Sequence, residues 1–172
     1  VRRAQCDPKP LQRPHPPILV GGGGRRVLEL AGREAVSVSL APRFAPGSAG
    51  ARRDPRTVTV AATEEKIDWI RAAAGERFDR IELNVYPSLV PVTLVADNEV
   101  RRAAADLAAD VEARTGIPIG VDELLAAPNA LVGSVDSLVA KLRDLRAGLG
   151  ISSFMVGDID TLAPVVERLA GE

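Results

Sequence analysis

The sequence contains few cysteines and histidines, and this scarcity excludes whole classes of site. Cys6 is the only cysteine in 172 residues, so no disulfide can form within the chain, and a reducing, cytoplasmic location is expected. His15 is the only histidine. A structural zinc site normally takes four ligands, so Cys6 and His15 cannot build one, and no metal is expected.

Aromatic residues and unbalanced charge are also scarce. The chain has one tryptophan, one tyrosine and three phenylalanines, and its 22 basic residues nearly balance its 23 acidic ones. A base-stacking platform and a strongly positive surface are therefore lacking, which excludes nucleic acid as an expected partner. No apolar run approaches the roughly 18–20 residues that cross a bilayer, so no membrane partner is expected either. A small molecule is the expected substrate.

The composition is that of a folded domain. Apolar residues make up 46% of the chain, which suffices for one globular core. Residues 1–17 contain five prolines and no periodic pattern, so they are predicted to be a linker or tail that precedes a domain at 18–172.

Apolar stretches with strand-like and helix-like spacing alternate through this domain. Such alternation is typical of an α/β fold with parallel strands and helical crossovers, and four βα units are predicted. Residues 41–57 are predicted to be a loop, with a short extended piece at 57–60. Thr63, Asp97 and Ser134 are predicted helix N-caps. The predicted strands cover 18–20, 36–40, 81–85 and 153–156, and the predicted helices 25–33, 63–74, 97–115, 121–126, 134–149 and 162–169, with Pro164 in the first turn of the last helix.

A run of four glycines, Gly21, Gly22, Gly23 and Gly24, lies between the first predicted strand and helix. Glycine lets the backbone approach a ligand closely, and a helix N-terminus offers free N–H groups to an anion. Arg25 and Arg26 add positive charge to the first helical turn. The six residues together predict a phosphate site.

Two familiar nucleotide motifs do not match this run. Arg26 occupies the place of the third glycine of the dinucleotide fingerprint, and no Gly-Lys-Ser/Thr follows as in a Walker loop. The alternative interpretation is a flexible turn with solvated arginines.

The third predicted strand carries polar residues on one side. Ile81, Leu83 and Val85 alternate with Glu82 and Asn84, so in a barrel Glu82 and Asn84 would face the lumen, as would Ser37 and Ser39 on the second strand. Glu82, Asn84 and Ser39 are therefore candidate substrate contacts. The alternative is an edge strand with one solvent-exposed face, or a polar network that only stabilises the fold. No catalytic residue can be assigned.

Several segments in order resemble the luciferase-like monooxygenase superfamily, and more narrowly its coenzyme F420-dependent oxidoreductases, which occur mainly in actinobacteria. The glycine stretch PPILVGGGGRRVL at 16–28 resembles the turn after the fifth strand of that family. The other matching segments are 73–78, 81–85, 131–136, 149–152 and 163–171.

The resemblance implies a (β/α)₈ barrel of which this chain is the C-terminal half, strands five to eight. It implies an oxidoreductase that transfers a hydride to or from an organic substrate, with coenzyme F420 as the first and FMN as the second choice of cofactor. It also implies that the glycine turn, with Arg25 and Arg26, holds the phosphate of that cofactor.

A half barrel leaves strand edges and an apolar face exposed. The expected partner is therefore a separately encoded N-terminal half or a second copy of the chain, unless the chain is poorly stable alone. The alternative function is a non-catalytic half-barrel remnant that binds a partner chain or a phosphate-bearing ligand.

Overall fold

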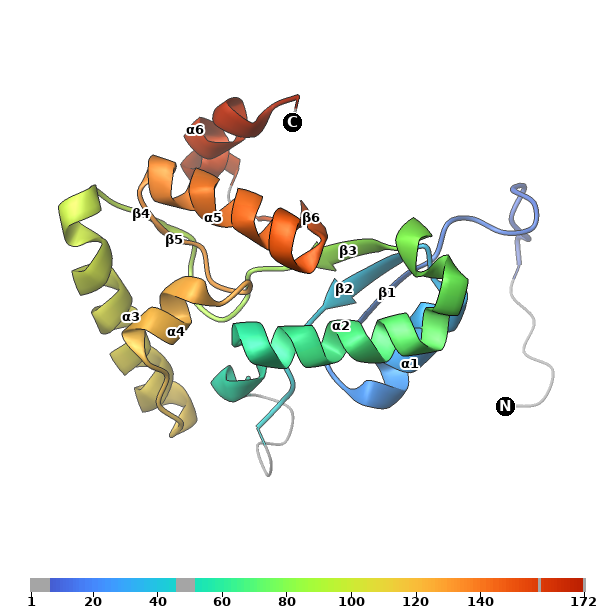
Figure 1. Cartoon of the computed structure of the whole chain (residues 1–172), viewed down its shortest axis with the longest axis horizontal. Helices are drawn as coiled ribbons and strands as arrows, with labels where there is room; N and C mark the ends of the chain where they lie inside the picture. Colours follow the sequence, from blue (N-terminus) through green and yellow to red (C-terminus); the bar gives the residue numbers. More distant parts are fainter. Residues whose placement is uncertain (1–6, 46–51, 158, 172) are drawn as a thin grey trace.

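A four-stranded parallel sheet forms the centre of the molecule. The structure is a computed structural model, and it describes residues 7–45, 52–157 and 159–171. The strands lie in the order β1-β2-β3-β6, which follows the sequence, although the strands β4 and β5 of a separate pair come between β3 and β6 along the chain (Figure 1). Each strand is joined to the next through at least one helix, as the predicted βα units require. The bounds are β1 Leu19–Gly22, β2 Ser37–Leu40, β3 Glu82–Val85 and β6 Ile151–Phe154.

Helices α1 (Arg25–Glu34) and α2 (Val60–Ala74) cover one face of this sheet. The apolar sides of these two helices pack against the strand side chains that point towards them, and together they form a buried cluster. A 3₁₀ stretch, Gly75–Arg80, then returns the chain to β3. The cluster includes Leu28, Ile70, Val38, Leu83 and Ile151.

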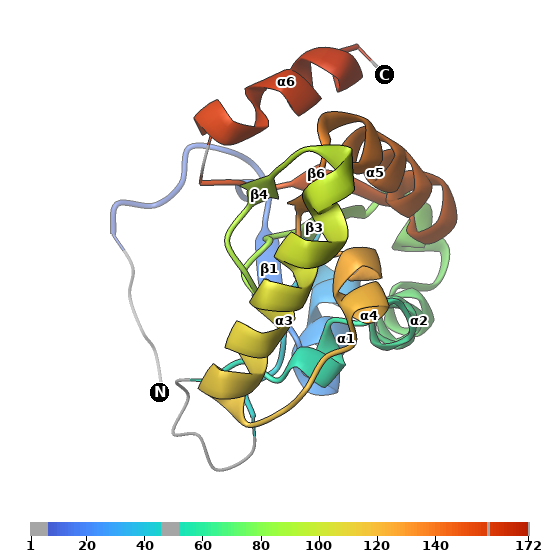
Figure 2. The same ribbon diagram turned by 90° about the vertical axis from the view of Figure 1, so that its left-hand side faces the viewer.

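A second unit is inserted between β3 and α5 (Val135–Leu149). It consists of the short parallel pair β4 (Thr93–Leu94) and β5 (Val132–Gly133) and the helices α3 (Val100–Thr115) and α4 (Val121–Ala126). Its own apolar cluster includes Leu89, Val111 and Leu124. Figure 2 shows this unit beside the sheet, and α6 (Ile159–Leu169) on the far side of α5 from α1 and α2.

Three helix starts differ from the predictions. Helix α2 begins one turn early, because Thr59 accepts from the Ala62 N–H and is the N-cap, whereas Thr63 lies inside the helix and donates to the Thr59 carbonyl. Asp97 begins a 3₁₀ turn, Asp97–Glu99, rather than α3 itself. Helix α6 starts at Ile159, which places Pro164 beyond the first turn. Ser134 is the N-cap of α5, as predicted, and accepts from the Ser137 N–H.

Some strand predictions were wrong as well. Strand β1 continues into Gly21 and Gly22, and β6 begins at Ile151 and ends at Phe154. The extended piece predicted at 57–60 is instead the end of a 3₁₀ turn, Pro55–Thr57, and the start of α2. Strands β4 and β5 were not predicted, because a two-residue strand carries no alternation to detect.

The tail predicted at 1–17 is described from residue 7 onward. Residues 7–17 are exposed and contain neither helix nor strand, while residues 1–6 lie outside the described part. Among the described residues, none of the helices has both the length and the apolar character that crossing a bilayer demands.

Candidate functional site

The glycine turn joins the carboxyl end of β1 to the amino end of α1. A Cβ built on Gly23 would lie 2.5 Å from the Ala41 carbonyl oxygen, and one on Gly22 would lie 2.6 Å from a methyl of Val27. Gly22 and Gly23 are therefore required by close packing within the protein. A Cβ on Gly24 would meet nothing within 4 Å, and one on Gly21 would make only ordinary contact with Ser39.

The first turn of α1 has unpaired backbone N–H groups. Val27 and Leu28 both donate to the Gly24 carbonyl at 3.1 Å, and Gly24 has no side chain that could cap the turn. Within the described part of the chain, the N–H groups of Arg25 and Arg26 have no acceptor. Donors of this kind at a helix N-terminus are able to bind an anion.

The two arginines of this turn are not equivalent. The Arg25 guanidinium donates to Glu29 at 2.7 Å, one turn along the helix. Arg26 is exposed and has no ion pair with any residue that the structure describes. Arg26 is therefore the more available positive charge beside the glycine turn.

A row of small and polar residues crosses all four strands on the sheet face opposite α1 and α2. Strand register aligns Gly21 with Ser39, Ser39 with Asn84, and Asn84 with Ser153. We call this set the polar row. Because the neighbouring positions Val38, Leu83 and Val85 belong to the cluster under the helices, the polar row lies on the face that a closed barrel would enclose.

Asn84 is the buried member of the polar row and has an incompletely satisfied amide. It is only 2% exposed, and its Nδ2 donates to the Ser153 hydroxyl at 2.9 Å. Its Oδ1 is the one buried side-chain polar atom without a partner among the described residues. A buried acceptor without a donor costs free energy, so this atom marks a place where a further donor would stabilise the protein.

Glu82 lies on the same face, one level nearer the amino ends of the strands. It is exposed and accepts from the Ser37 hydroxyl at 3.2 Å. Glu82, Asn84 and Ser39 therefore share one face of the sheet, as their alternation indicated, and their role as substrate contacts stays a prediction. The sequence did not indicate that Asn84 on β3 bonds to Ser153 on the neighbouring strand β6. The two residues are 69 positions apart in the chain.

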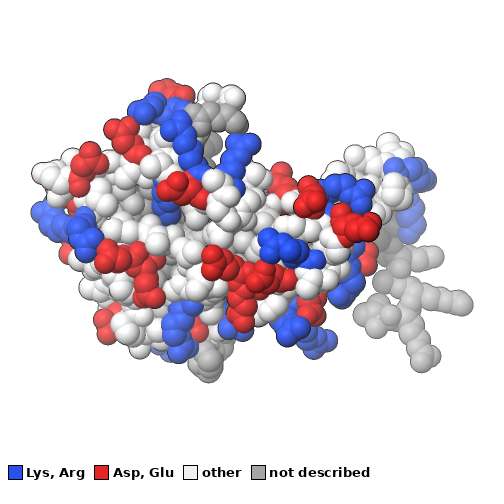
Figure 3. All heavy atoms as spheres, viewed as in Figure 1, with Lys and Arg blue, Asp and Glu red and all other residues white. Residues whose placement is uncertain are grey.

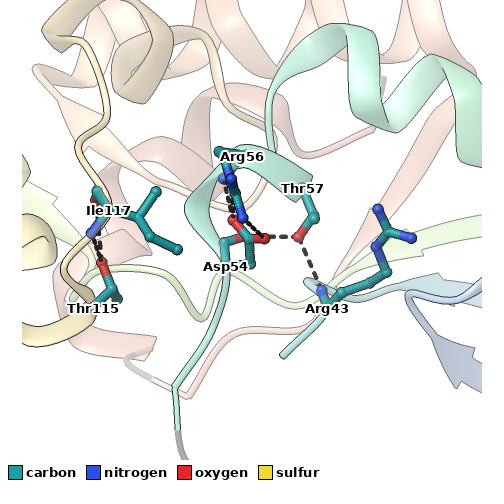
Figure 4. A network of polar contacts seen from close by, with 6 residues as sticks. All are labelled: Arg43, Asp54, Arg56, Thr57, Thr115 and Ile117. Carbon is teal, nitrogen blue, oxygen red and sulfur yellow. Dashed lines mark hydrogen bonds and ion pairs between the residues drawn. The ribbon is translucent and has the colours of Figure 1, made fainter. Parts of the chain in front are cut away.

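The segment after β2 was expected to be an unstructured loop, but its two ends pair as a short antiparallel hairpin around Phe44 and Arg53. Residues 46–51 between them lie outside the described part. Figure 4 shows the base of this hairpin: Thr57 accepts from the Arg43 N–H at 2.9 Å and donates to the Asp54 carbonyl at 2.7 Å. Asp54 receives two further bonds from the Arg56 guanidinium, which lowers the pKa of the carboxyl.

Lys66 on α2 ties this hairpin to the end of β2. Its ammonium group is buried and donates to the carbonyls of Ala41 and Thr57, at 2.9 and 2.5 Å. Burial, and to a smaller degree the nearby Arg43, lower the pKa of Lys66 to about 8. The Lys66 ammonium forms no ion pair with a carboxylate of the described residues, and its bonds to two carbonyls hold the carboxyl end of β2 in place.

Asn129 and Lys141 hold the inserted unit. Asn129 is 1% exposed, and its Nδ2 donates to the carbonyls of Leu40 and Tyr86, at the ends of β2 and β3. Lys141 donates to three carbonyls, Leu125, Ala127 and Ala130, at 2.6, 2.8 and 2.6 Å. Burial lowers its pKa to about 7. Sequence reasoning missed these residues, because a lysine on a helix or an asparagine before a strand normally signals only a solvated surface or turn.

Comparison with models of protein families gives no match. Solved structures do share the architecture. Monooxygenase RslO1 from Streptomyces bottropensis is 23% identical with a TM-score of 0.51, over 87% of this chain and 43% of that one. Long-chain alkane monooxygenase LadA is 18% identical with a TM-score of 0.51, over 90% and 41%. Riboflavin lyase RcaE, solved with modified FMN and riboflavin, is 15% identical with a TM-score of 0.52, over 90% and 43%.

The chain therefore shares the fold of part of these proteins, a portion of a (β/α)₈ barrel. It spans less than half the length of each of the three proteins. Its four parallel strands with their helices are the predicted βα units of that barrel. That these are strands five to eight stays a prediction.

Proposed function

We propose that this chain is part of an oxidoreductase of the luciferase-like class that uses a deazaflavin or flavin cofactor. The glycine turn, with Arg25 and Arg26, would hold the cofactor phosphate. Coenzyme F420 is the first choice because the ordered sequence segments resemble enzymes that use it, and FMN is the second choice. When bound, such a cofactor supplies hydride transfer to or from an organic substrate.

The observation that carries the proposal is the uncapped first turn of α1. The N–H groups of Arg25 and Arg26 have no acceptor among the described residues and lie beside the open space at Gly24. A phosphate would accept from such donors and gain from the positive end of the helix dipole. The turn follows the carboxyl end of a parallel strand, which is where barrel enzymes bind their ligands.

The polar row would line the lumen of the completed barrel, where the substrate would bind. Ser39 offers a hydroxyl on the enclosed face, and beside it Asn84 Oδ1 is a buried acceptor without a donor among the described residues. Groups of this kind orient a substrate and replace water around it. The residue that exchanges a proton with the substrate is not assigned.

A complete lumen requires more polypeptide than this chain. Strands β1 and β6 are both edges of the four-stranded sheet, and Glu82 is exposed on the face that would be enclosed. A complementary half can supply a basic residue opposite Glu82, whereas a second copy would bring a second Glu82 carboxylate to the same level of the lumen. Burial of like charges is unfavourable, so the complementary half is preferred over the homodimer.

The proposal is tested by the binding of FMN and of riboflavin, which differ only in the phosphate. Both are titrated into the purified chain and followed by fluorescence, with coenzyme F420 in a parallel series. Saturable binding of FMN or F420, with riboflavin at least tenfold weaker, is expected. Arg26→Gln should weaken the binding of FMN and leave that of riboflavin unchanged, and Arg102→Gln, on the distant helix α3, is the matched control.

Equal affinity for FMN and riboflavin would contradict a phosphate site in the glycine turn. Absence of binding by all three cofactors would instead favour the alternative function, a non-catalytic half-barrel remnant that binds a partner chain or another phosphate-bearing ligand.

A further inference from the structure

A groove runs between helices α2 and α5. It consists of two neighbouring cavities of about 330 and 310 Å³, which share Glu64, Gly148 and Leu149. We call it the α2–α5 groove. The lining residues fall on one side of each helix, as their spacing along the sequence requires. Because α2 covers the sheet face opposite the polar row, the groove lies outside the candidate lumen.

The larger cavity of the groove has an apolar floor. Leu145 and Leu149 of α5 form part of it, with Val60 of α2 and Ala126 of α4 beside them. Gly148 leaves this floor open, since a Cβ built there would meet nothing within 4 Å. Packing within the protein therefore does not require a glycine at this position. An apolar group that covers the floor would gain free energy by leaving water.

Carboxylates from two helices line the same cavity. Glu64 belongs to α2 and Asp144 to α5, and both side chains are exposed. Neither forms an ion pair or a hydrogen bond with any residue that the structure describes. Asp68, which lines the smaller cavity, is instead paired with Arg71 at 2.7 Å. The unpaired negative charge of the groove is therefore concentrated at its larger cavity.

Lys141 does not neutralise these two carboxylates. Among the described residues that line the larger cavity, it is the one basic residue, and its ammonium donates to three backbone carbonyls at and after the end of α4. Two carboxylates therefore face at most one ammonium, which leaves a surplus of at least one negative charge. Figure 3, in the same view as Figure 1, shows acidic side chains gathered over α2 on this face of the molecule.

We propose that the larger cavity of the α2–α5 groove binds a small aliphatic amine. The ammonium group of the amine would lie between Glu64 and Asp144 and donate charge-assisted hydrogen bonds to their carboxylates. Its alkyl chain would cover the floor at Gly148 and Leu145, as the stems of lysine side chains cover apolar surface. The volume of the cavity suits a short chain rather than a polymer. This site shares no residue with the glycine turn or the polar row, so substitutions can separate it from the proposed cofactor site.

The test titrates the ¹⁵N-labelled chain with hexylamine, which is a cation at neutral pH, and with 1-hexanol, which has the same alkyl chain without the charge. Both titrations are done at constant ionic strength. Saturable amide shifts at Glu64, Asp144 and Gly148 are expected with hexylamine. Because the two carboxylates are exposed, 1-hexanol should bind only about fivefold more weakly.

Three substitutions locate the site. Glu64→Gln and Asp144→Asn should each raise the dissociation constant of hexylamine about threefold and leave that of 1-hexanol unchanged. Asp106→Asn is the matched control, because Asp106 is an exposed carboxylate on α3 that does not line the groove. Gly148→Leu should weaken the binding of both compounds, since its side chain would occupy the floor. Thermal unfolding of each variant verifies that it is folded.

Equal affinity for hexylamine and 1-hexanol overturns the inference, as does the absence of saturable shifts at the groove with hexylamine. An equal loss of affinity in Glu64→Gln and Asp106→Asn also overturns it, because that result indicates general charge screening. A third titration uses N-acetyl-lysine methylamide. If it binds as tightly as hexylamine, the occupant is the lysine side chain of a protein and the small amine is ruled out; weaker binding supports the small amine.

Discussion

At the scale of single residues, the four glycines of the turn are of two kinds, which the sequence alone does not distinguish. Gly22 and Gly23 have no room for a Cβ, whereas Gly21 and Gly24 do. The sequence predicts that this run is a turn whose backbone another group approaches closely. What approaches it most closely is the protein's own backbone at Ala41 and Pro42, and this packing depends on the tertiary fold.

Gly23→Ala is expected to lower the free energy of unfolding by about 2 kcal/mol, because its Cβ would collide with backbone atoms that cannot rotate away. Gly21→Ala is the matched control and should be nearly neutral, since its Cβ makes only ordinary contact with Ser39. Urea unfolding of both variants measures the difference. Equal stability of the two variants would contradict the steric account.

Lys141 predicts a pH dependence of stability. Its pKa is about 7 in the folded protein against 10.5 when unfolded, so between these values the unfolded chain binds more protons. Stability should therefore rise as the pH increases from about 7 to about 10. Lys66 acts in the same direction from about pH 8.

Lys141→Met should be destabilising by on the order of 3 kcal/mol, because three carbonyls lose their common donor. The variant should also lose part of the rise in stability with pH. Urea unfolding at several pH values compares it with the wild type. A constant difference across the pH range would show that the Lys141 pKa is not shifted.

At the scale of elements, helices with clear ends could be predicted and long-range pairings could not. Gly116 and Gly150 end α3 and α5 in the left-handed conformation, and Ser134 begins α5, as their local sequences indicated. Thr63 was mistaken for a cap because the acidic residues Glu64 and Glu65 follow it, as is favourable in a first helical turn. The Thr59 hydroxyl accepts from the Ala62 N–H instead, so the helix begins one turn earlier. The hairpin after β2 depends on Lys66 and Thr57, which no local pattern connects to it.

Asn129 joins the inserted unit to the ends of β2 and β3. Asn129→Asp removes the Nδ2 donor at nearly constant size and leaves a buried carboxylate against two carbonyls. Hydrogen exchange should accelerate throughout 87–133 while the strands β1 to β3 stay protected, because the contact is local. Asn98→Asp, on the surface before α3, is the control. Unchanged exchange in the insertion would show that Asn129 is not its anchor.

At the scale of the whole molecule, the sheet has open edges and apolar surface beside them. Next to β1, Leu19, Val27 and Leu30 are 49%, 42% and 48% exposed, and next to β6, Met155 is 51% exposed. The sequence predicted four βα units where a barrel needs eight, and that a separate half or a second copy completes the barrel stays a prediction. The chemistry of the sheet face opposite α1 and α2 could not be predicted in full, because the long-range pairing of β3 with β6 places Asn84 beside Ser153.

The chain alone is therefore expected to self-associate weakly through its apolar edges at micromolar concentration. Leu30→Glu should reduce the weight-average mass in sedimentation equilibrium without lowering the melting temperature, because Leu30 is half exposed. A wild-type chain that stays monomeric at all concentrations would contradict this expectation.

The central claim, that the glycine turn holds the cofactor phosphate, is tested most directly by amide-resolved NMR. Spectra of the chain with saturating FMN are compared with spectra at the same concentration of riboflavin, so that only the phosphate differs. The account predicts that the largest differences occur at the amides of Gly24, Arg25 and Arg26. Differences concentrated elsewhere in the chain, or spread evenly over it, would contradict it.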